Sequence, residues 1–450
     1  MRISKKKIIY FCLSLVLFIG LNYLLCFILM PSVGSSDKMW REYRKQEKLD
    51  MVITGTSLCY SCLNSEIIDP ILNINSYNMA TAAQELNNSY EAIETAIKDF
   101  NVKRVVLTFS YLNLVEYMNV RAETTFFRGK IANLPFGEKI KEIAKFSFSK
   151  RHFSAPESIN HIFPWVYTHV KFRPKKIYNN VLEKLHVRNE SYQKLYDETN
   201  APSNSVLNYN KIGNENSKTT YVGVKFNYGK VSNESFEELK KISDLCKKNN
   251  IDLILVNPPK PAFDVLSYGD EYFELYDYIK AFAQSEQFDY YDFSLIKPVV
   301  FVNQDDYYKD FEHMNAKGQK AFSKSFAEFL KLRDKGLNEG VTIDDLFYTK
   351  DEYVSSIDYI SCIYFDAETT AEQGIELTLH AYTGSDVTVL YEVLVKAPED
   401  SEYKTIQEYS QTDTLIYSPE KHGNYLIRVN AKTPDSENAF DRYYEKKIYY

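Results

Sequence analysis

The fold is decided by the stretch Asp50-Met51-Val52-Ile53-Thr54-Gly55-Thr56-Ser57-Leu58, where a short apolar run stops at Gly-Thr-Ser and an apolar, helix-capable segment follows. This order is typical of a buried parallel strand that delivers a hydroxyl group to the carboxyl edge of a sheet. Gly55 permits a tight turn, and Ser57 would then lie at a helix N-terminus, where free backbone N–H groups favour negative charge. Alone, Gly-x-Ser is a weak signal that favours an ordinary helix cap, so a catalytic interpretation depends on finding a base elsewhere.

Strand and helix patterns alternate on both sides of this stretch. Short apolar runs predict strands at residues 71–77, 103–109, 251–256 and 288–293. Apolar residues at helical spacing predict helices near residues 88–100, 235–249, 272–284 and 318–332. We therefore expect an α/β fold with a doubly wound parallel sheet and with chemistry at the carboxyl ends of its strands.

The chain has 450 residues, which is more than one hydrophobic core normally serves, so we expect several domains. Changes in composition along the chain indicate where these domains begin and end. The expected parts are a basic tail and transmembrane anchor (1–30), a stalk (31–48), the α/β domain (49–332), a linker (333–340) and a β-sandwich (341–450). Residues 115–232 interrupt the α/β pattern and are interpreted as a partly helical insertion suited to substrate selection. A net charge of −7 gives no reason to expect nucleic-acid binding.

The N-terminus predicts the location of the protein. Arg2 and three lysines precede an uncharged apolar run over residues 8–30, which is long enough to span a bilayer as a helix. The basic flank is expected to stay in the cytoplasm. Because no small-x-small cleavage site follows, retention as a signal anchor is favoured over removal as a signal peptide. We therefore expect a single-pass protein of the cell membrane with its remaining residues outside the cytoplasm.

The last 110 or so residues have a different pattern, typical of an immunoglobulin-like β-sandwich of about 100 residues. Alternating apolar runs separated by Gly, Asp, Ser and Pro turns predict strands at residues 356–365, 375–382, 387–395, 414–417, 425–430 and 443–449. The many tyrosines could line a glycan-binding surface. Aromatic residues at alternating positions are more often core, and this interpretation is favoured.

The cysteines and histidines do not suggest a metal site or a disulfide framework. Cys59 and Cys62 could form a redox pair, but packing on the helix after Ser57 is favoured because both are small and apolar. His152, His161 and His169 do not share a helical face, so structural histidines are favoured over metal ligands.

Basic residues gather within the insertion, at Arg151, Lys171, Arg173, Lys175 and Lys176. Such a cluster could attract an anionic polymer or lipid headgroups. A solvated basic face is the simpler interpretation and is favoured.

The base that Ser57 needs is found in Asp310-Phe311-Glu312-His313, which precedes the last predicted helix of the α/β domain. A serine hydroxyl attacks acyl groups usefully when an imidazole accepts its proton and a carboxylate orients that imidazole. Asp310 and His313, three residues apart on one turn, can place both side chains on the same side. We expect this pair to meet Ser57 at the carboxyl edge of the sheet.

With these two motifs the sequence resembles the SGNH/GDSL hydrolase superfamily over about residues 49–332. Gly55-Thr56-Ser57 is similar to its first block, Asp310 and His313 match its last block, and Asn78-Met79-Ala80-Thr81-Ala82-Ala83-Gln84 is similar to its second block. The resemblance implies a flavodoxin-like three-layer fold with Ser57 as nucleophile, His313 as base and Asp310 as its orienting partner. It further implies an oxyanion hole formed by the backbone N–H groups of Ser57 and Ala83, with no metal and no cofactor.

The general layout resembles membrane-anchored members of that superfamily which act on bacterial envelope polymers. These include polysaccharide O-acetylation proteins and the teichoic acid D-alanine transfer protein. The resemblance implies a serine esterase or O-acyltransferase that acts on ester groups of a cell-surface polysaccharide or another envelope polymer, with a membrane acyltransferase as a candidate partner.

Two departures from the family pattern keep other functions open. The second-block glycine is replaced by Ala83, and the third-block asparagine, a side-chain donor to the oxyanion, has no clean match near Ser110 and Asn113. The main alternative is a non-catalytic, degenerate SGNH scaffold that binds glycan or organises an envelope polymer machine. A further alternative is an adhesin whose active part is the β-sandwich.

Overall fold

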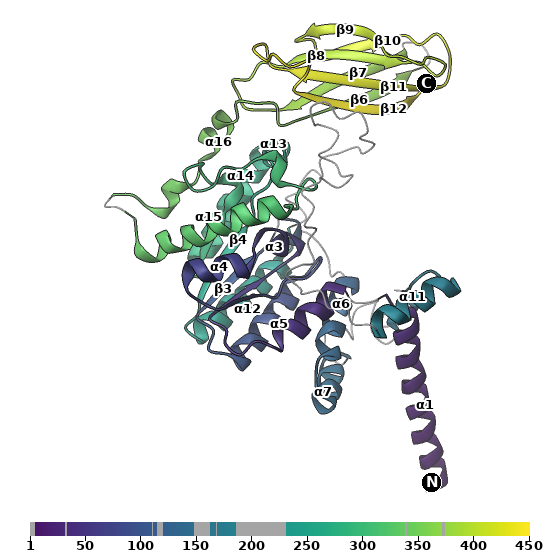
Figure 1. Ribbon diagram of the computed structural model, residues 1–450, viewed down its shortest axis with the longest axis vertical. Helices are drawn as coiled ribbons and strands as arrows, with labels where there is room; N and C mark the ends of the chain where they lie inside the picture. Colours follow the sequence, from purple (N-terminus) through teal and green to yellow (C-terminus); the bar gives the residue numbers. More distant parts are fainter. Residues whose placement is uncertain are drawn as a thin grey trace.

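The computed structural model describes residues 5–31, 34–109, 111–114, 120–147, 163–167, 169–185, 231–337, 340–370 and 374–450. An α/β domain occupies the centre of the molecule, and antiparallel sheets from the C-terminal part of the chain lie at one end (Figure 1). Helix α1 (Lys5–Leu29) projects from the other end, so the two chain termini lie far apart. A second helix, α2 (Gly34–Tyr43), connects α1 to the α/β domain.

Five parallel strands form the central sheet, as the sequence predicts. They are β1 (Met51–Thr54), β2 (Ser76–Asn78), β3 (Arg104–Thr108), β4 (Asp252–Asn257) and β5 (Asp289–Asp292). Their order in space is β2-β1-β3-β4-β5, with all neighbours parallel. This is the doubly wound order in which the strand sequence reverses beside β1, and it leaves a crevice at the carboxyl end of β1. The predicted α/β class is confirmed.

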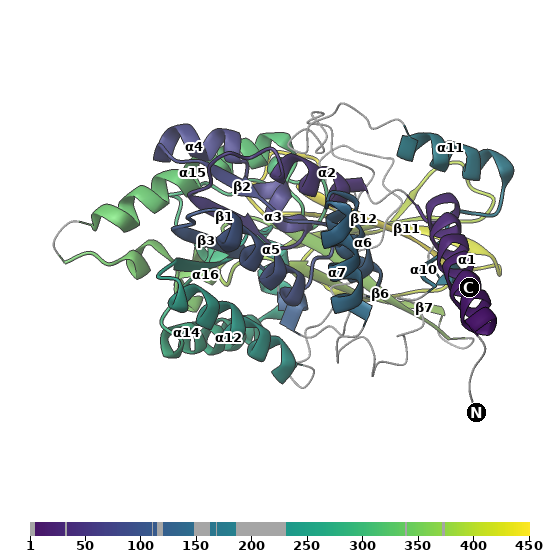
Figure 2. The same ribbon diagram turned by 90° about the horizontal axis from the view of Figure 1, so that it is seen from below.

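Helices cover both faces of the sheet (Figures 1 and 2). One face carries α3 (Ser57–Cys62), α4 (Ser65–Leu72) and α15 (Ala316–Lys335), and the other carries α5 (Leu86–Asp99), α12 (Asn233–Lys248) and α14 (Asp270–Ser285). Because side chains alternate along a strand, Ile53 packs toward the α15 side while Val52 packs toward the α5 side. Both are fully buried, which explains why β1 is a continuous apolar run.

The predicted strand at residues 71–77 is wrong in its first half. Residues up to Leu72 belong to α4, and Asn73 ends this helix in the left-handed conformation with φ of 54°. The Asp69 carboxylate then accepts the backbone N–H of Ser76 at 3.0 Å, which orients the chain into β2. The apolar Ile71 and Leu72 therefore pack from a helix end against the core.

The insertion is partly helical where it is described, as predicted. Its helices are α6 (Val120–Ala132), α7 (Phe136–Ser147), α10 (Pro164–Tyr167) and α11 (Pro174–Leu185). Ser110, Arg151, His152 and His161 lie outside the described residues.

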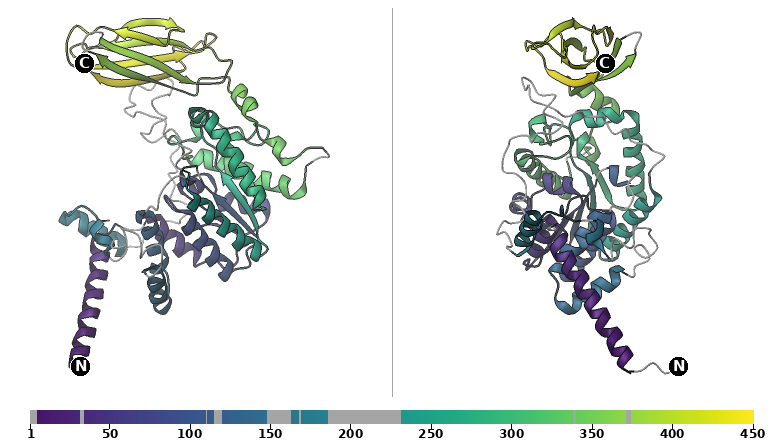
Figure 3. Two further views of the ribbon diagram at one scale, coloured as in Figure 1. Left: turned by 180° about the vertical axis from the view of Figure 1, so that it is seen from behind. Right: turned by 90° about the vertical axis from the view of Figure 1, so that its right-hand side faces the viewer.

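The C-terminal part forms two antiparallel sheets that face each other when seen end-on (Figure 3). One contains β6 (Cys362–Thr370), β7 (Gly374–Tyr382) and β10 (Thr414–Tyr417); the other contains β8 (Leu390–Lys396), β9 (Lys404–Ser410), β11 (Asn424–Lys432) and β12 (Arg442–Tyr449). The expected strand at 356–365 starts too early, because α16 (Lys350–Ser356) precedes β6. Strand β9 was not predicted, since it is a polar edge strand with no buried residue.

Candidate active site

The turn after β1 delivers Ser57 to the carboxyl edge of the sheet. Gly55 has φ of +144°, and a Cβ atom there would lie 2.2 Å from the carbonyl oxygen of Thr108 on β3. Only glycine allows β1 to pass so close to its neighbour and still turn. Thr56 caps α3 by accepting the backbone N–H of Leu58 at 3.3 Å. Ser57 is the first residue of α3, where backbone N–H groups lack partners within the helix.

Ser57 and His313 meet although 256 positions separate them in the sequence. The distance between Ser57 Oγ and His313 Nε2 is 2.8 Å. His313 Nδ1 lies 2.9 Å and 3.0 Å from the two carboxylate oxygens of Asp310. Because an ionised carboxylate only accepts hydrogen bonds, Nδ1 carries the ring proton and Nε2 is left free to accept the proton of Ser57. The three residues that the sequence singles out therefore form one hydrogen-bonded relay.

The loop that carries Asp310 and His313 is fixed by its own backbone. The Asp310 Oδ1 atom accepts the backbone N–H groups of Glu312 at 3.1 Å and of His313 at 2.6 Å. Burial opposes ionisation of Asp310, but these bonds and the contact with the His313 ring outweigh burial and lower the pKa of the carboxyl group. Asp310 thus stays ionised at neutral pH and holds His313 in one tautomer.

Helix α15 holds this loop against the helix that carries Ser57. Gln319 Nε2 donates to the Tyr60 carbonyl oxygen at 2.7 Å, and Ser323 Oγ donates to the Cys62 carbonyl oxygen at 3.0 Å. Both acceptors are in α3. The carbonyl groups of Tyr60 and Cys62 are thereby satisfied by α15, which begins three residues after His313. The distance between nucleophile and base is therefore set by helix packing as well as by the loop.

The segment after β2 lies beside the Ser57 turn. Met79 N–H donates to the Ile53 carbonyl oxygen at 2.6 Å, and Thr81 N–H donates to the Gly55 carbonyl oxygen at 3.2 Å. These bonds continue the parallel pairing beyond the ends of the two strands. Ala83 follows in the left-handed conformation, with φ of 50° and an exposed side chain. This conformation favours glycine, and alanine adopts it at a cost while keeping its backbone N–H group.

Gln84 anchors this segment and was not singled out from the sequence. Its buried amide donates to Thr54 Oγ1 at 2.7 Å and to Ser89 Oγ at 3.0 Å, and its Oε1 atom accepts the Thr81 hydroxyl at 2.9 Å. Gln84 therefore joins the end of β1 to the segment containing Ala83. The signal in the sequence was a polar residue directly after an apolar and small-residue stretch, but only the fold shows its partners.

Asn78 and the cysteines serve the packing around the turn. The Asn78 amide donates to the Leu63 carbonyl oxygen at 3.0 Å, and its oxygen accepts Ala80 N–H at 3.0 Å. Cys59 and Cys62 are free and buried on α3, as the packing interpretation predicts. Burial raises the pKa of the Cys59 thiol to about 12, so this thiol is protonated and unreactive at neutral pH.

The side-chain donor expected after β3 is not identified among the described residues 111–114. Ser110 lies outside the described residues. Asn113 belongs to a 3-10 turn, η1 (Tyr111–Leu114), and its carbonyl oxygen accepts Ser235 Oγ at 3.1 Å. The assignment of the Ser57 and Ala83 N–H groups as oxyanion donors stays a prediction.

Two charged residues outside the relay, Lys260 and Glu312, lie near it and were not predicted. Lys260 follows β4, is 4% exposed, and pairs with the buried carboxylate of Asp264 at 3.0 Å. Glu312 Oε1 lies 3.8 Å from His313 Nδ1. Burial raises the pKa of the Glu312 carboxyl group, and the Lys260 charge opposes this rise. Glu312 stands between Asp310 and His313 in the sequence, but its relation to Lys260 depends on the tertiary fold.

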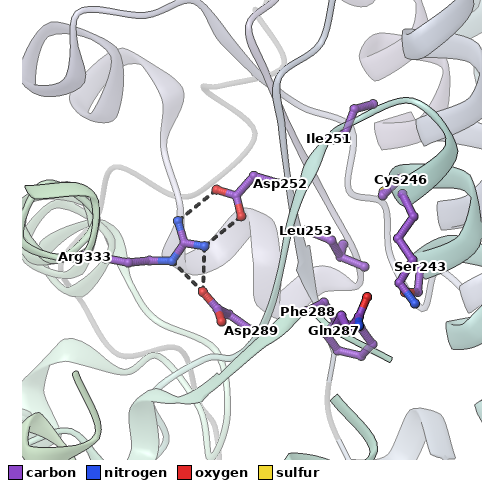
Figure 4. Close-up of a pocket in the computed structure, with 10 residues that line it drawn as sticks. Ser243, Cys246, Ile251, Asp252, Leu253, Gln287, Phe288, Asp289 and Arg333 are labelled. Atoms are coloured by element: carbon purple, nitrogen blue, oxygen red, sulfur yellow. Dashed lines mark hydrogen bonds and ion pairs between the residues drawn. The ribbon is translucent and has the colours of Figure 1, made fainter. Parts of the chain in front are cut away.

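The opposite edge of the sheet carries an ion-pair network instead of a reactive site. Arg333 of α15 pairs with Asp252 at 2.7 Å and with Asp289 at 2.6 Å, where β4 and β5 begin (Figure 4). Arg104 of β3 also pairs with Asp252 at 2.7 Å. The adjoining cavity of about 140 Å³ is far from Ser57, because parallel strands place their two ends at opposite edges of the sheet. The network ties α15 to three strands and is structural.

No protein-family model matches the sequence, and no curated protein matches it. A candidate acylhydrolase from Bacteroides fragilis has a similar solved structure, with 12% identity and a TM-score of 0.29 over 65% of this chain and 94% of its own. The structure of a candidate lipolytic protein of the G-D-S-L family from Desulfitobacterium hafniense has 10% identity and a TM-score of 0.29, and the match covers 62% of this chain and 99% of that protein. The structure of a GDSL-like lipase from Bacteroides thetaiotaomicron has 10% identity and a TM-score of 0.28, and the match covers 66% of this chain and 98% of that protein. At these TM-scores the likeness does not bear on activity, which has to be inferred from the contacts of Ser57.

Proposed function

We propose that the protein is a membrane-anchored serine esterase or acyltransferase of the SGNH type that acts on ester groups of a cell-surface polysaccharide. The observation that carries this proposal is the relay from Ser57 Oγ to His313 Nε2 at 2.8 Å and from His313 Nδ1 to Asp310. A serine at a helix N-terminus with this relay has the parts needed to form an acyl-enzyme.

In the first half of the reaction, Ser57 Oγ attacks the carbonyl carbon of the ester while His313 Nε2 takes the hydroxyl proton. Asp310 stabilises the imidazolium ion that forms, because its carboxylate is ionised and accepts the Nδ1 proton. The negative charge on the carbonyl oxygen is stabilised by the N–H groups of Ser57 and Ala83. His313 then returns the proton to the leaving alcohol, and the acyl group stays on Ser57.

In the second half, His313 takes a proton from the acceptor and the acceptor oxygen attacks the acyl carbon. The Ser57–acyl bond breaks, and the proton on His313 returns to Ser57 Oγ. If the acceptor is water, the product is a free acid and the protein is an esterase. If the acceptor is a sugar hydroxyl, the acyl group is transferred. Both outcomes use the same residues, so the relay does not decide between them.

The proposed location rests on α1. This helix is long and apolar enough to cross a membrane, and its side chains are largely exposed in the folded chain. The basic residues before α1 favour a cytoplasmic N-terminus, which would put the Ser57 site outside the cytoplasm. An extracytoplasmic site held near the membrane suits an envelope polymer as substrate.

A fluorophosphonate probe tests the nucleophile directly, because it reacts with activated serines. We expect the full chain in detergent to be labelled at Ser57 and the Ser57→Ala variant to remain unlabelled. Ser61, a buried serine in the same helix, provides a matched control as Ser61→Ala. Equal labelling of the wild-type chain and Ser57→Ala would exclude Ser57 as the nucleophile.

The substrate is tested in cells by comparing the acyl content of envelope polymers between wild type and Ser57→Ala. More acyl groups in the variant indicate an esterase, and fewer indicate a transferase. An unchanged acyl content, together with unlabelled Ser57, would favour the alternative of a non-catalytic scaffold. The observation that supports the scaffold alternative is Ala83, because its side chain restricts a loop in which the SGNH pattern has glycine.

A further inference from the structure

Two short helices of the insertion, α10 and α11, contact α1, and Figure 1 shows α11 beside the end of α1. We call residues 163–167 and 169–185 the collar. The collar supplies partners for the last carbonyl groups of α1, which have none within the helix. Asn180 donates to the carbonyl oxygens of Ile28 and Met30 at 3.0 and 2.8 Å, and Lys184 donates to those of Phe27 and Met30. The collar is therefore fixed to α1 by hydrogen bonds.

The collar also contacts α1 further along the helix. Trp165 Nε1 donates to Asn22 Oδ1 at 2.8 Å, and the rings of Phe163 and Phe18 pack edge to face at 5.8 Å. Asn22 lies about 10 Å from the end of α1, at 1.5 Å per residue. If α1 spans the bilayer as proposed, α11, which contacts residues 27–30, is held at the level where the hydrocarbon gives way to the headgroups.

The surface of the collar that faces away from α1 combines apolar and basic side chains. Phe172, Tyr178 and Leu185 are 62%, 63% and 61% exposed. Lys171, Arg173, Lys175 and Lys176 are exposed as well, and Glu183 is the single acidic residue between positions 169 and 185. Exposed aromatic side chains beside lysine and arginine are the composition of segments that lie in the interface of a bilayer.

We propose that the collar is a lipid-binding site, in which Lys171, Arg173, Lys175 and Lys176 bind the phosphate groups of anionic phospholipids while Tyr178 and Leu185 enter the interface. This inference rests on the membrane anchoring in the proposed function but not on the catalytic role of Ser57. A basic side chain near an anionic surface gains roughly fivefold in partitioning. Four such side chains would fix the orientation of the insertion relative to the membrane.

The site can be tested with a fluorescent probe at position 178 of the full chain in lipid nanodiscs. Tyr178→Cys is made in a chain with Cys12→Ser and Cys26→Ser, because the other cysteines are at most 1% exposed and do not react. The quencher is a phospholipid with a nitroxide on its headgroup. A probe at Tyr278, a tyrosine of α14 that is 50% exposed and belongs to the α/β domain, is the matched control.

We expect quenching at position 178 to be several-fold stronger in discs containing phosphatidylglycerol than in discs of phosphatidylcholine alone. Replacing Lys171, Arg173, Lys175 and Lys176 by Gln should remove this difference, whereas Lys320→Gln with Lys324→Gln on α15 should preserve it. Equal quenching at positions 178 and 278, or no dependence on the anionic lipid, in chains that stay inserted in the discs would overturn the proposal. Fluorophosphonate labelling of Ser57 in the same discs reports on catalysis separately, so a failure of either proposal can be recognised.

Discussion

Replacing Asp310 by Asn tests the relay more sharply than removal of the nucleophile does. The substitution keeps the shape of the side chain and one oxygen, which can still accept the backbone N–H of His313. It removes the negative charge and presents an amide group to the imidazole. Because the amide donates where the carboxylate accepted, His313 would take the other tautomer, with its proton on Nε2. Nε2 could then no longer accept the proton of Ser57, although 2.8 Å would still separate the two atoms.

The expected loss in kcat is about 10⁴-fold, as for other relays of this type in which the orienting carboxylate becomes an amide. This corresponds to roughly 5.5 kcal/mol in activation free energy. The loss in stability should be small, because one backbone bond and the packing remain. The pKa of Asp310 is lowered, so this carboxylate contributes stability above the ordinary carboxyl pKa near 4, and the contribution disappears as the pH falls through the lowered value. The variant should therefore show less acid destabilisation than the wild type.

The assay is release of nitrophenol from a short-chain nitrophenyl ester, together with the rate of fluorophosphonate labelling. Asp306→Asn is the matched control, because Asp306 is an exposed aspartate just before the same loop and pairs with Lys317. The control should keep its activity within about twofold, as expected for an exposed ion pair. If Asp310→Asn keeps more than about a tenth of the wild-type kcat, orientation of His313 by Asp310 is not part of the mechanism.

Three further substitutions test the structure around the relay. Gly55→Ala should destabilise the protein by roughly 3 kcal/mol or more in urea unfolding, because its Cβ would lie 2.2 Å from the Thr108 carbonyl oxygen at φ of +144°; a midpoint equal to wild type would contradict this. Ala83→Gly should change stability by less than about 1 kcal/mol, since relief of strain offsets chain entropy, and kcat should not fall because the N–H group stays. Arg333→Ala should cost roughly 2 kcal/mol at neutral pH, as it breaks the pairs with Asp252 and Asp289. Hydrogen bonds from Arg333 and Arg104 outweigh burial and lower the pKa of Asp252. The stability lost in Arg333→Ala should therefore become smaller below about pH 4, where Asp252 is protonated in the unfolded chain. A loss of stability that does not depend on pH would argue against the ion pairs.

The parts of the fold that follow from local patterns could be predicted from the sequence. The apolar run of β1 is buried on both faces, so its pattern is continuous and clear. The capped start of α15 and the short Asp310–His313 turn are also local, which is why the pairing of these residues could be expected. Their meeting with Ser57 follows once the strands are known to be parallel, because parallel strands present their carboxyl ends at one edge.

The remaining features depend on tertiary contacts that no local pattern reports. Ile71 and Leu72 are apolar in either a strand or a helix end, so periodicity could not assign them. Strand β9 is polar because it is an edge strand, and its pairing with β8 is what makes it a strand. The sequence marks Gln84 only by its place directly after an apolar and small-residue stretch, and its role comes from three partners on different segments.

The left-handed backbone at Ala83 differs in its setting from the other non-glycine residues with positive φ. Among the described residues, three other non-glycine residues have positive φ, and Asn73, Asn250 and Gln287 all stand at the C-terminal ends of helices, where the left-handed conformation is common. Ala83 instead lies in the turn closed by the Gln84 N–H group and the Thr81 carbonyl oxygen at 3.3 Å, where a non-glycine residue at positive φ costs about 1–3 kcal/mol. The conformation persists because Gln84 and the pairing with the β1 turn hold the segment in place. If Ala83 supplies an oxyanion donor as proposed, these contacts would hold its N–H group in one direction, which is what stabilisation of an oxyanion requires.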